Sequence, residues 1–449
     1  MDQPSVTRIE STPVPTPGVT PLEHGLSVHY RYYVLALLWL VALFRFVDLQ
    51  IIAVLLEPIK AEFAFSDTQL ALLGGLAFAL FYAGLGLPIA WLADRYTRRD
   101  IIATAVGLWS LMTALCGLAT GFVSLFLARM GVGVGEAGAY PPTTSLLCDY
   151  FPEHQRARIF SILASAIPAG VFTGFLIGGI VNEYYGWRLA FQIVGIPGIV
   201  LALLLHLTVR ELPRGFSEPG SATQQTDSFR SALHALWKIP AYRHVVSGAC
   251  LFTLGAYGSG IWLPSWFMRQ YAFSSAEIGT WMALLYGGGG LAGAMLGGWL
   301  AEKRVNDTGQ RGWYMQVCAW SLLAIVPFAC FVLLWPDPVQ ALCMHLFVTI
   351  LMHMNIGPVL AMVQALAGLR RRAMAQAVNV LVSNLIALPL GPLLIGVASD
   401  TFTPLYGNQA LGLAILALMI LAYGWAALHF FQAARTLGAD MDAAKRNSG

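Results

Sequence analysis

Four charged side chains lie within long apolar stretches of this sequence, and their types and spacing could support proton or anion chemistry. Arg45 and Asp48 are three residues apart, and Arg129 and Glu136 are seven residues apart. Each spacing returns both side chains to one face of an α-helix, so it predicts an Arg45–Asp48 pair and an Arg129–Glu136 pair. A charge in apolar surroundings is costly unless it is paired, and so each of the four needs a partner or a role.

Three interpretations of these four residues are open. They could form two structural salt bridges that hold helices together. Alternatively, Asp48, Glu136, Arg129 and Arg45 could couple proton binding to a conformational change. Desolvation raises the pKa of a buried carboxyl group, and a nearby guanidinium lowers it. An arginine that moves toward or away from a carboxylate therefore changes the proton affinity of that carboxylate. Arg45 or Arg129 could also bind an anionic headgroup, because guanidinium pairs well with phosphate and carboxylate.

The second half of the chain carries polar and aromatic side chains, but no charge, within its apolar stretches. A neutral, aromatic wall that faces a charged wall would suit an amphiphile or an organic anion. A single His or Asn in a membrane helix also often bonds only a neighbouring helix. The residues that we expect to line a substrate cavity are Tyr257, Trp262, His353, Asn355, Asn379 and Asn384.

The composition is that of a membrane protein. Hydrophobic residues make up 57% of the 449 residues and charged residues only 11%. Soluble domains carry about 25% charged residues, so a water-soluble fold of this size could not cover its surface. The apolar runs reach the roughly 20 residues that a helix needs to cross a bilayer, and they lack the short alternating segments of a β-barrel. The sequence therefore predicts an all-α, multi-pass membrane protein.

Polar breaks between the apolar runs predict twelve transmembrane helices in two six-helix bundles. We expect helices over residues 33–57, 69–93, 99–119, 122–147, 156–182, 188–208, 243–270, 277–301, 313–334, 339–364, 372–399 and 409–433. The expected domains are a disordered cytoplasmic tail (1–30), an N-terminal bundle (31–208), a cytoplasmic linker (209–240), a C-terminal bundle (241–433) and a cytoplasmic tail (434–449).

The distribution of basic residues predicts that both termini are cytoplasmic. Membrane proteins concentrate Lys and Arg in their cytoplasmic loops. With this orientation, the outer loops contain only Lys60, Arg188 and Arg269. The inner segments contain Arg95, Arg98, Arg99, Arg156, Arg158, Lys303, Arg304, Arg311, Arg370, Arg371 and Arg372, among others.

An internal repeat supports two related halves. Residues 91–95 (Trp-Leu-Ala-Asp-Arg) match residues 299–303 (Trp-Leu-Ala-Glu-Lys) in residue type and charge order. Two parallel six-helix halves, with a substrate site between them near mid-membrane, are typical of major facilitator transporters.

Several classes of function have no support in the sequence. The six cysteines lie in or at the ends of apolar runs without metal-ligand spacing, and we expect no metal and no cofactor. The glycines at 131, 133 and 135 follow no strand, so they do not predict a nucleotide-binding loop and are better explained by helix packing. The loops are too short for a nucleotide-binding domain, and no nucleophile has a base at usable spacing. We expect neither an enzyme nor a nucleic-acid partner.

The segment Asp94 to Arg99 resembles the loop signature of the major facilitator superfamily. The resemblance implies that Asp94, Arg95, Arg98 and Arg99, with Glu302 and Lys303 in the repeat, brace a cytoplasmic gate. Within the superfamily, residues 48–67, 129–142 and 383–396 resemble bacterial spinster-like transporters. The chain is similar to this family over residues 31 to about 433.

The spinster resemblance implies transport of lysolipids or sphingolipids and roles for Asp48, Arg129 and Glu136. The family usually has Asp-Arg in its first helix, whereas Leu49 follows Asp48 here and Arg45 lies one turn earlier. We therefore expect a monomeric, proton-coupled, alternating-access transporter of an amphipathic lipid-like anion in the bacterial inner membrane. Its partners would be protons, this substrate and the lipid bilayer. The alternatives are a symporter of a small organic acid and a non-transporting membrane receptor.

Overall fold

The computed structural model describes residues 26–93, 95–213, 216–217, 229–368 and 371–446, and these residues form helices and connecting turns without a β-strand. The first half contains α1 (Val28–Phe63), α2 (Asp67–Ala71), the π-helical turn η2 (Leu72–Leu76), α3 (Ala77–Ala93), α4 (Arg98–Cys116), α5 (Phe122–Glu136), α6 (Tyr140–Tyr150), α7 (Glu153–Ala164), α8 (Ala166–Tyr185) and α9 (Trp187–Thr208).

The second half follows a similar plan after the short helix α10 (Phe229–Trp237). It contains α11 (Pro240–Tyr271), α12 (Ser275–Leu284), the π-helical turn η3 (Leu285–Gly289), α13 (Gly290–Thr308), α14 (Trp313–Leu334), α15 (Pro338–His353), α16 (Ile356–Ala367), α17 (Arg372–Val382), the π-helical turn η5 (Ser383–Ala387), α18 (Leu388–Tyr406), the 3₁₀ turn η6 (Gly407–Gln409) and α19 (Ala410–Arg446).

Each of the twelve helical ranges expected from the sequence is predominantly helical. Ten segments among the described residues are long and apolar enough to cross a membrane. One of them, residues 374–444, is 71 residues long and includes α18 and nearly all of α19. The last helix extends beyond the expected end at residue 433, because residues 432–446 are rich in alanine and other strong helix formers. The all-α membrane fold is confirmed.

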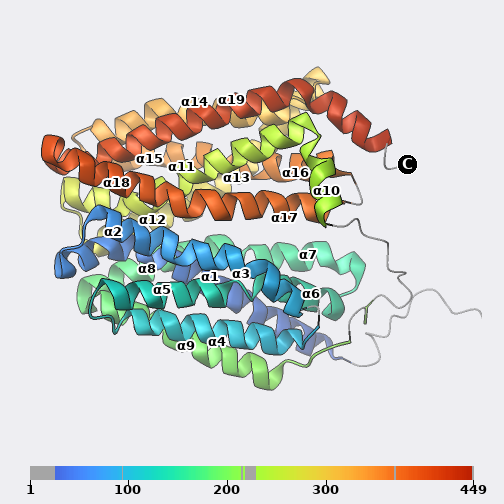
Figure 1. The fold of residues 1–449 in the computed structure, drawn as a ribbon, viewed down its shortest axis with the longest axis horizontal. Helices are drawn as coiled ribbons and strands as arrows, with labels where there is room; N and C mark the ends of the chain where they lie inside the picture. Colours follow the sequence, from blue (N-terminus) through green and yellow to red (C-terminus); the bar gives the residue numbers. More distant parts are fainter. Residues whose placement is uncertain (1–25, 94, 214–215, 218–228, 369–370, 447–449) are drawn as a thin grey trace, which may run out of the picture.

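The helices form two groups that lie side by side along their length (Figure 1). The first group comprises α1 to α9 and the second comprises α11 to α19, and they meet where α8 packs on α12, α1 on α11, and α2 with η2 on α18. The start of α1, the end of α9, α10 and the end of α19 lie at one end, which we call the linker end. We call the opposite end, where α1 turns into α2, the far end.

The two halves share a turn at the far end that lies outside the sequence repeat of residues 91–95 and 299–303. Ala64 ends α1 and Ala272 ends α11, both in the left-handed conformation with φ of 54° and 55°. Each is followed by a capping box, Ser66 with Gln69 and Ser274 with Glu277, that starts the next helix. A π-helical turn then follows in both halves. The repeat is therefore also present in the backbone.

Glycine allows the two halves to approach closely at the α8–α12 contact. A Cβ atom on Gly279 would lie 2.5 Å from the carbonyl oxygen of Phe175, and one on Gly179 would lie 2.3 Å from that of Ser275. Backbone atoms cannot move aside as a flexible side chain can. Because no side chain fits there, the two helices approach until their backbones are in contact.

We expect Gly279→Ala to lower the free energy of unfolding by about 1–3 kcal/mol, because the new methyl group must separate α8 from α12. Denaturation of the purified protein in detergent measures this change. Gly288→Ala is the matched control, since a Cβ there meets nothing within 4 Å. Equal stability of the two variants would contradict the close contact.

Candidate functional site

The four buried charges form two ion pairs between α1 and α5. Arg45 Nε donates to Glu136 Oε2 over 3.0 Å, and Arg129 Nη1 donates to Asp48 Oδ2 over 3.4 Å. Thr113 Oγ1 on α4 donates to Asp48 Oδ1 over 2.7 Å. Asp48, Arg129 and Glu136 are almost wholly buried. The structure therefore brings these charges together between helices.

The Arg45–Asp48 and Arg129–Glu136 pairs expected from spacing are wrong. Helix side chains point toward the N-terminus of their own helix, so Arg45 extends away from Asp48 and Arg129 extends away from Glu136. Because α1 and α5 run in opposite directions, each arginine instead meets the carboxylate of the other helix. Sequence spacing within one helix carries no information about this partner.

An aromatic ring of α3 lies against the guanidinium group of each arginine. Arg45 Nη2 donates to the Tyr82 hydroxyl over 2.8 Å, and its guanidinium lies 5.1 Å from the centre of the Tyr82 ring. The guanidinium of Arg129 lies 5.9 Å from the centre of the Phe78 ring. Such contacts stabilise a cation that has lost its water.

Several polar atoms near the pairs have no hydrogen-bond partner among the residues that the structure describes. They are Arg129 Nε and Nη2, Glu136 Oε1 and the Tyr257 hydroxyl. Tyr257 belongs to α11 of the second half but packs against the hydrophobic core of the first half. Buried polar groups without partners are rare in native proteins and point to a site that takes up a proton, water or ligand.

A cavity of about 910 Å³ lies between the halves, toward the linker end. Glu136 and Asn384 line it from opposite halves, and Tyr140 and Arg372 are exposed at its rim. The lining is mostly apolar and aromatic. Its residues are Tyr82, Ala83, Gly86, Glu136, Ala137, Tyr140, Pro141, Thr144, Phe160, Gln364, Arg372, Gln376, Ala377, Val380, Leu381 and Asn384.

The other residues expected to line the cavity occupy different places. Asn355 and Asn379 line a separate pocket of about 240 Å³ in the second half. Trp262 is fully buried and donates to the carbonyl oxygen of Pro392 over 3.0 Å. His353 Nδ1 lies 2.8 Å from the carbonyl oxygen of Thr349. In the described conformation, Tyr257, Trp262 and His353 are absent from the lining of the central cavity.

The residues expected at the cytoplasmic gate lie at the linker end, except Asp94, which is outside the described residues. Arg98 is buried and binds Asp149 on α6 and Glu211 after α9, the latter over 2.7 Å. It thereby ties three parts of the first half together. Arg99 donates its backbone N–H to Glu211 over 2.9 Å. The remaining expected gate residues, Arg95, Glu302 and Lys303, are exposed.

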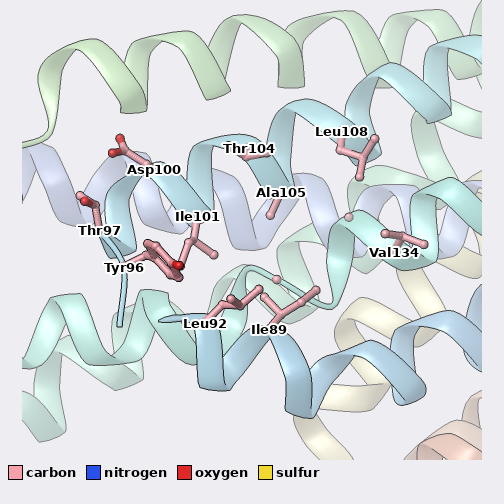
Figure 2. A pocket seen from close by; sticks show the side chains of 12 residues that line it. Ile89, Leu92, Tyr96, Thr97, Asp100, Ile101, Thr104, Ala105, Leu108 and Val134 are labelled. Atoms are coloured by element: carbon pink, nitrogen blue, oxygen red, sulfur yellow. The ribbon is translucent and has the colours of Figure 1, made fainter. Parts of the chain in front are cut away.

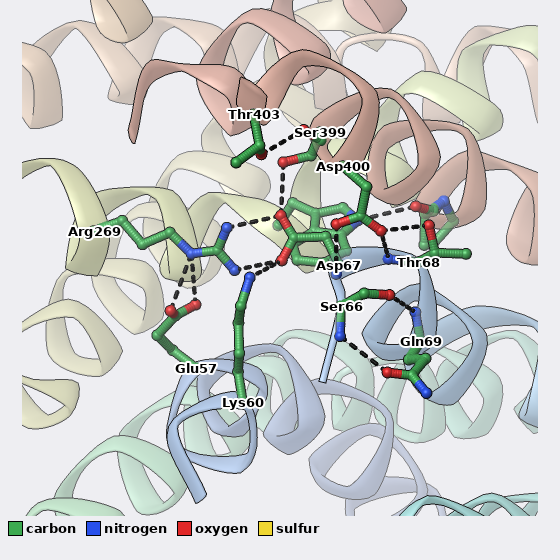
Figure 3. A network of polar contacts seen from close by, with 12 residues as sticks. Glu57, Lys60, Ser66, Asp67, Thr68, Gln69, Arg269, Ser399, Asp400 and Thr403 are labelled. Atoms are coloured by element: carbon green, nitrogen blue, oxygen red, sulfur yellow. Dashed lines mark hydrogen bonds and ion pairs between the residues drawn. The ribbon is translucent and has the colours of Figure 1, made fainter. Parts of the chain in front are cut away.

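A polar network at the far end connects the two halves (Figure 3). Asp67 on α2 accepts hydrogen bonds from Arg269 on α11, over 2.8 and 2.7 Å, and from Ser399 on α18, over 2.6 Å. Arg269 also donates to Glu57 on α1 over 2.9 Å. Asp400 accepts from the backbone N–H groups of Asp67 and Thr68 at the start of α2. We call this set of residues the far-end network.

The far-end network is not among the sites predicted from the sequence. Arg269 is expected there only as one of three basic residues in outer loops. The available signal was the pair of acidic residues Asp67 and Asp400, which follow apolar runs at the same predicted end of the molecule. Their partners come from helices far apart in the chain, and the sequence alone does not show which helices meet.

A third pocket, of about 390 Å³, lies within the first half between α3, α4 and α5 (Figure 2). Ile89, Leu108 and Val134 give it an apolar wall, and Thr97 and Asp100 lie at its polar end near the start of α4. It includes no residue of the second half. It is therefore separate from the space between the halves.

Comparison with known proteins identifies the family. The model of the Major Facilitator Superfamily matches residues 38–392. The chain belongs to the major facilitator superfamily. Members of this superfamily are transporters, so the chain is a membrane transporter and not an enzyme.

Individual relatives place the chain near the spinster proteins. It is 30% identical to an MFS-type efflux pump of Mycolicibacterium smegmatis, over 85% of this chain and 87% of that protein. It is 30% identical to protein spinster homolog 1 of Xenopus tropicalis, over 84% of this chain and 74% of that one. The chain is also similar to the crystal structure of a bacterial homologue of the human lysosomal transporter Spinster in an inward-facing, unoccupied conformation. The sequence identity is 30% and the TM-score is 0.83, and the match covers 92% of this chain and 99% of that one. The spinster-like resemblance is confirmed.

We expect Arg45→Met to destabilise the protein by about 3–5 kcal/mol, because it leaves Glu136 buried without its partner. Adding Glu136→Gln should recover about 0.5–3 kcal/mol of this loss. Thermal or denaturant unfolding in detergent measures both values. The matched control is Arg45→Met with Glu153→Gln, at an exposed carboxylate at the start of α7, which should recover nothing. Equal recovery in the two double variants would contradict the Arg45–Glu136 pair.

Proposed function

We propose that this chain is a proton-coupled transporter that moves an amphipathic, lipid-like anion by alternating access. The observation that carries the proposal is the position of Glu136. This carboxylate lines the cavity between the halves, pairs with Arg45 through Oε2, and leaves Oε1 without a partner among the described residues.

Glu136 offers a direct route from proton binding to conformational change. A proton that binds Oε1 would neutralise the carboxylate and remove the charge that holds Arg45. Arg45 would then need a new anionic partner, and a substrate headgroup in the cavity could provide one. Asp48 and Arg129 form a second pair one helical turn away that could respond in the same way.

The cavity supports an amphipathic substrate better than a small acid. Its volume of about 910 Å³ is at the upper end of the range for small-molecule sites. Apolar and aromatic side chains form most of its wall, and the buried Glu136 and the exposed Arg372 are its charged lining residues. A small organic acid would call for a closed, polar pocket. The sphingosine-1-phosphate transporter of Danio rerio, 28% identical over 81% of this chain, also favours a lipid-like anion.

We propose that the linker end faces the cytoplasm of the bacterial inner membrane. Basic residues gather at this end, including Arg98, Arg156 and Arg304, as the positive-inside rule requires. The cavity lies toward the same end, whereas the far-end network joins the halves at the other end. The described conformation would then be inward-facing, like the bacterial Spinster homologue to which it is similar.

Proton coupling predicts that Asp48→Asn and Glu136→Gln each reduce gradient-driven transport about fivefold or more, because a coupling free energy of 1–3 kcal/mol is lost. The assay is uptake of a fluorescent lysolipid into proteoliposomes with an imposed pH gradient. Glu153→Gln, at an exposed carboxylate at the start of α7, is the control and should keep wild-type rates. Unchanged gradient dependence in both buried variants would overturn proton coupling.

Alternating access predicts that Arg269→Gln opens the far end. The variant removes the cation that links Asp67 and Glu57 to α11, and Lys60 on α1 still pairs with Asp67 over 2.5 Å, so the loss costs about 1–3 kcal/mol. Such a cost shifts a two-state equilibrium about 5- to 150-fold. Spin labels at Tyr184 and Leu405, exposed on opposite halves, should report longer distances.

The control for this experiment is Arg188→Gln. Arg188 pairs with Glu62 within the first half, also at the far end, and so its loss should leave the label distances unchanged. Identical label distances in Arg269→Gln and in the wild-type protein would show that the far-end network does not hold the two halves together at the far end.

A further inference from the structure

A small pocket in the second half contains buried hydrogen-bond acceptors that no described residue satisfies. It measures about 240 Å³ and lies between α11, α16, α17 and η5. Gln376 lines both this pocket and the central cavity, so the two spaces adjoin at that side chain. We call it the amide pocket.

Three amide oxygens belong to the lining of the amide pocket. Asn355 Oδ1, Gln376 Oε1 and Asn379 Oδ1 are buried and have no hydrogen-bond partner among the described residues. Thr253 Oγ1 donates to the carbonyl oxygen of Ala249, so its lone pairs are also available as acceptors. Leaving one buried acceptor unpaired is costly, and three at one pocket point to an occupant that donates hydrogen bonds.

The orientation of the Asn355 amide is set by its surroundings. Asn355 is 0% exposed, and its Nδ2 donates to Ser321 Oγ and to the carbonyl oxygens of Met352 and Leu351. Turning the amide over would place Oδ1 against those two carbonyl oxygens, which cannot donate. Its oxygen therefore remains the atom without a partner.

Asn355 lies where a membrane helix is interrupted. The α15 helix ends at His353 and α16 begins at Ile356, and the Asn355 side chain does not cap the new helix. The first half has a similar interruption after Glu136, where α5 ends and α6 begins at Tyr140. Interrupted helices are tolerated at membrane depth where they line a cavity, and transporters use them to build binding sites.

We propose that the amide pocket binds the hydrogen-bond-donating part of the substrate headgroup, an ammonium or a hydroxyl group. This inference rests on the proposed transport of a lipid-like anion. A water molecule occupies about 30 Å³ in the liquid, so about 240 Å³ holds a group of several non-hydrogen atoms, such as ethanolamine or glycerol. The described lining includes no carboxylate, which disfavours a divalent metal ion.

The three unpaired acceptor oxygens make a specific selection among headgroups. An ethanolamine headgroup presents three N–H donors and a glycerol headgroup presents hydroxyl donors. A choline headgroup is methylated at nitrogen and presents no N–H, so it would fill the pocket without pairing the oxygens. Sites built to pair with a donor discriminate strongly against an analogue that lacks it.

Equilibrium binding to the purified full-length protein in nanodiscs tests this selection. The probes are lysophosphatidylethanolamine, lysophosphatidylglycerol and lysophosphatidylcholine with the same acyl chain. The wild-type protein should bind the first two at least about tenfold more tightly than the third, because two or more hydrogen bonds are gained. Asn379→Leu should reduce this preference to about threefold or less, and Asn379→Asp, which keeps the acceptors, should retain it.

Gln364→Leu is the matched control, because Gln364 lines the central cavity but not the amide pocket, and it should leave the preference unchanged. Gln376→Met provides a second test at the pocket if Asn379→Leu does not fold. Equal binding of the three lipids, or a preference that survives both pocket variants, would overturn the amide pocket and leave the proposed function intact. Failure of all three lipids to bind would overturn the proposed function and this inference together.

Discussion

The first half of the structure depends on the pairing of buried charges across helices. Each of Arg45, Asp48, Arg129 and Glu136 would be costly alone in an apolar bundle, and the cost falls only when α1 and α5 lie at the depth and rotation that join them. Thr113 on α4 and Tyr82 on α3 complete the shell around the pairs. The charges thus specify the relative placement of four helices, and they also supply the groups that could respond to a proton.

The second half uses the same backbone plan with different chemistry. Both halves have the left-handed alanine, the capping box and the π-helical turn at the far end, and both interrupt the helix that faces the cavity. In the first half this interruption follows a carboxylate, Glu136, whereas in the second it carries a neutral amide, Asn355. One framework therefore presents charge on one side and unpaired acceptors on the other.

Contacts between the halves toward the far end are of two kinds. Gly179 and Gly279 bring the backbones of α8 and α12 together, and Ser275 beside them donates through Oγ to the carbonyl oxygen of Gly179 and through its backbone N–H to Glu183, each over 3.1 Å. The far-end network instead concentrates charge, because Asp67 joins α1, α2, α11 and α18 through its partners. At the linker end, Arg98 and Glu211 brace the first half internally and leave the cavity between the halves.

The sequence alone predicts the membrane-protein class, the twelve helical ranges, the four charges in apolar stretches and the family, because hydropathy and residue type can be read locally along the chain. It also identified Glu136 and Asn384, which line the central cavity. It paired the charges wrongly and did not identify the far-end network or the amide pocket. Those features depend on which helices become neighbours and on which way each side chain leans. Tertiary packing decides both, because the partners of Arg45 and Asp67, and the residues that share a pocket with Gln376, come from distant parts of the chain.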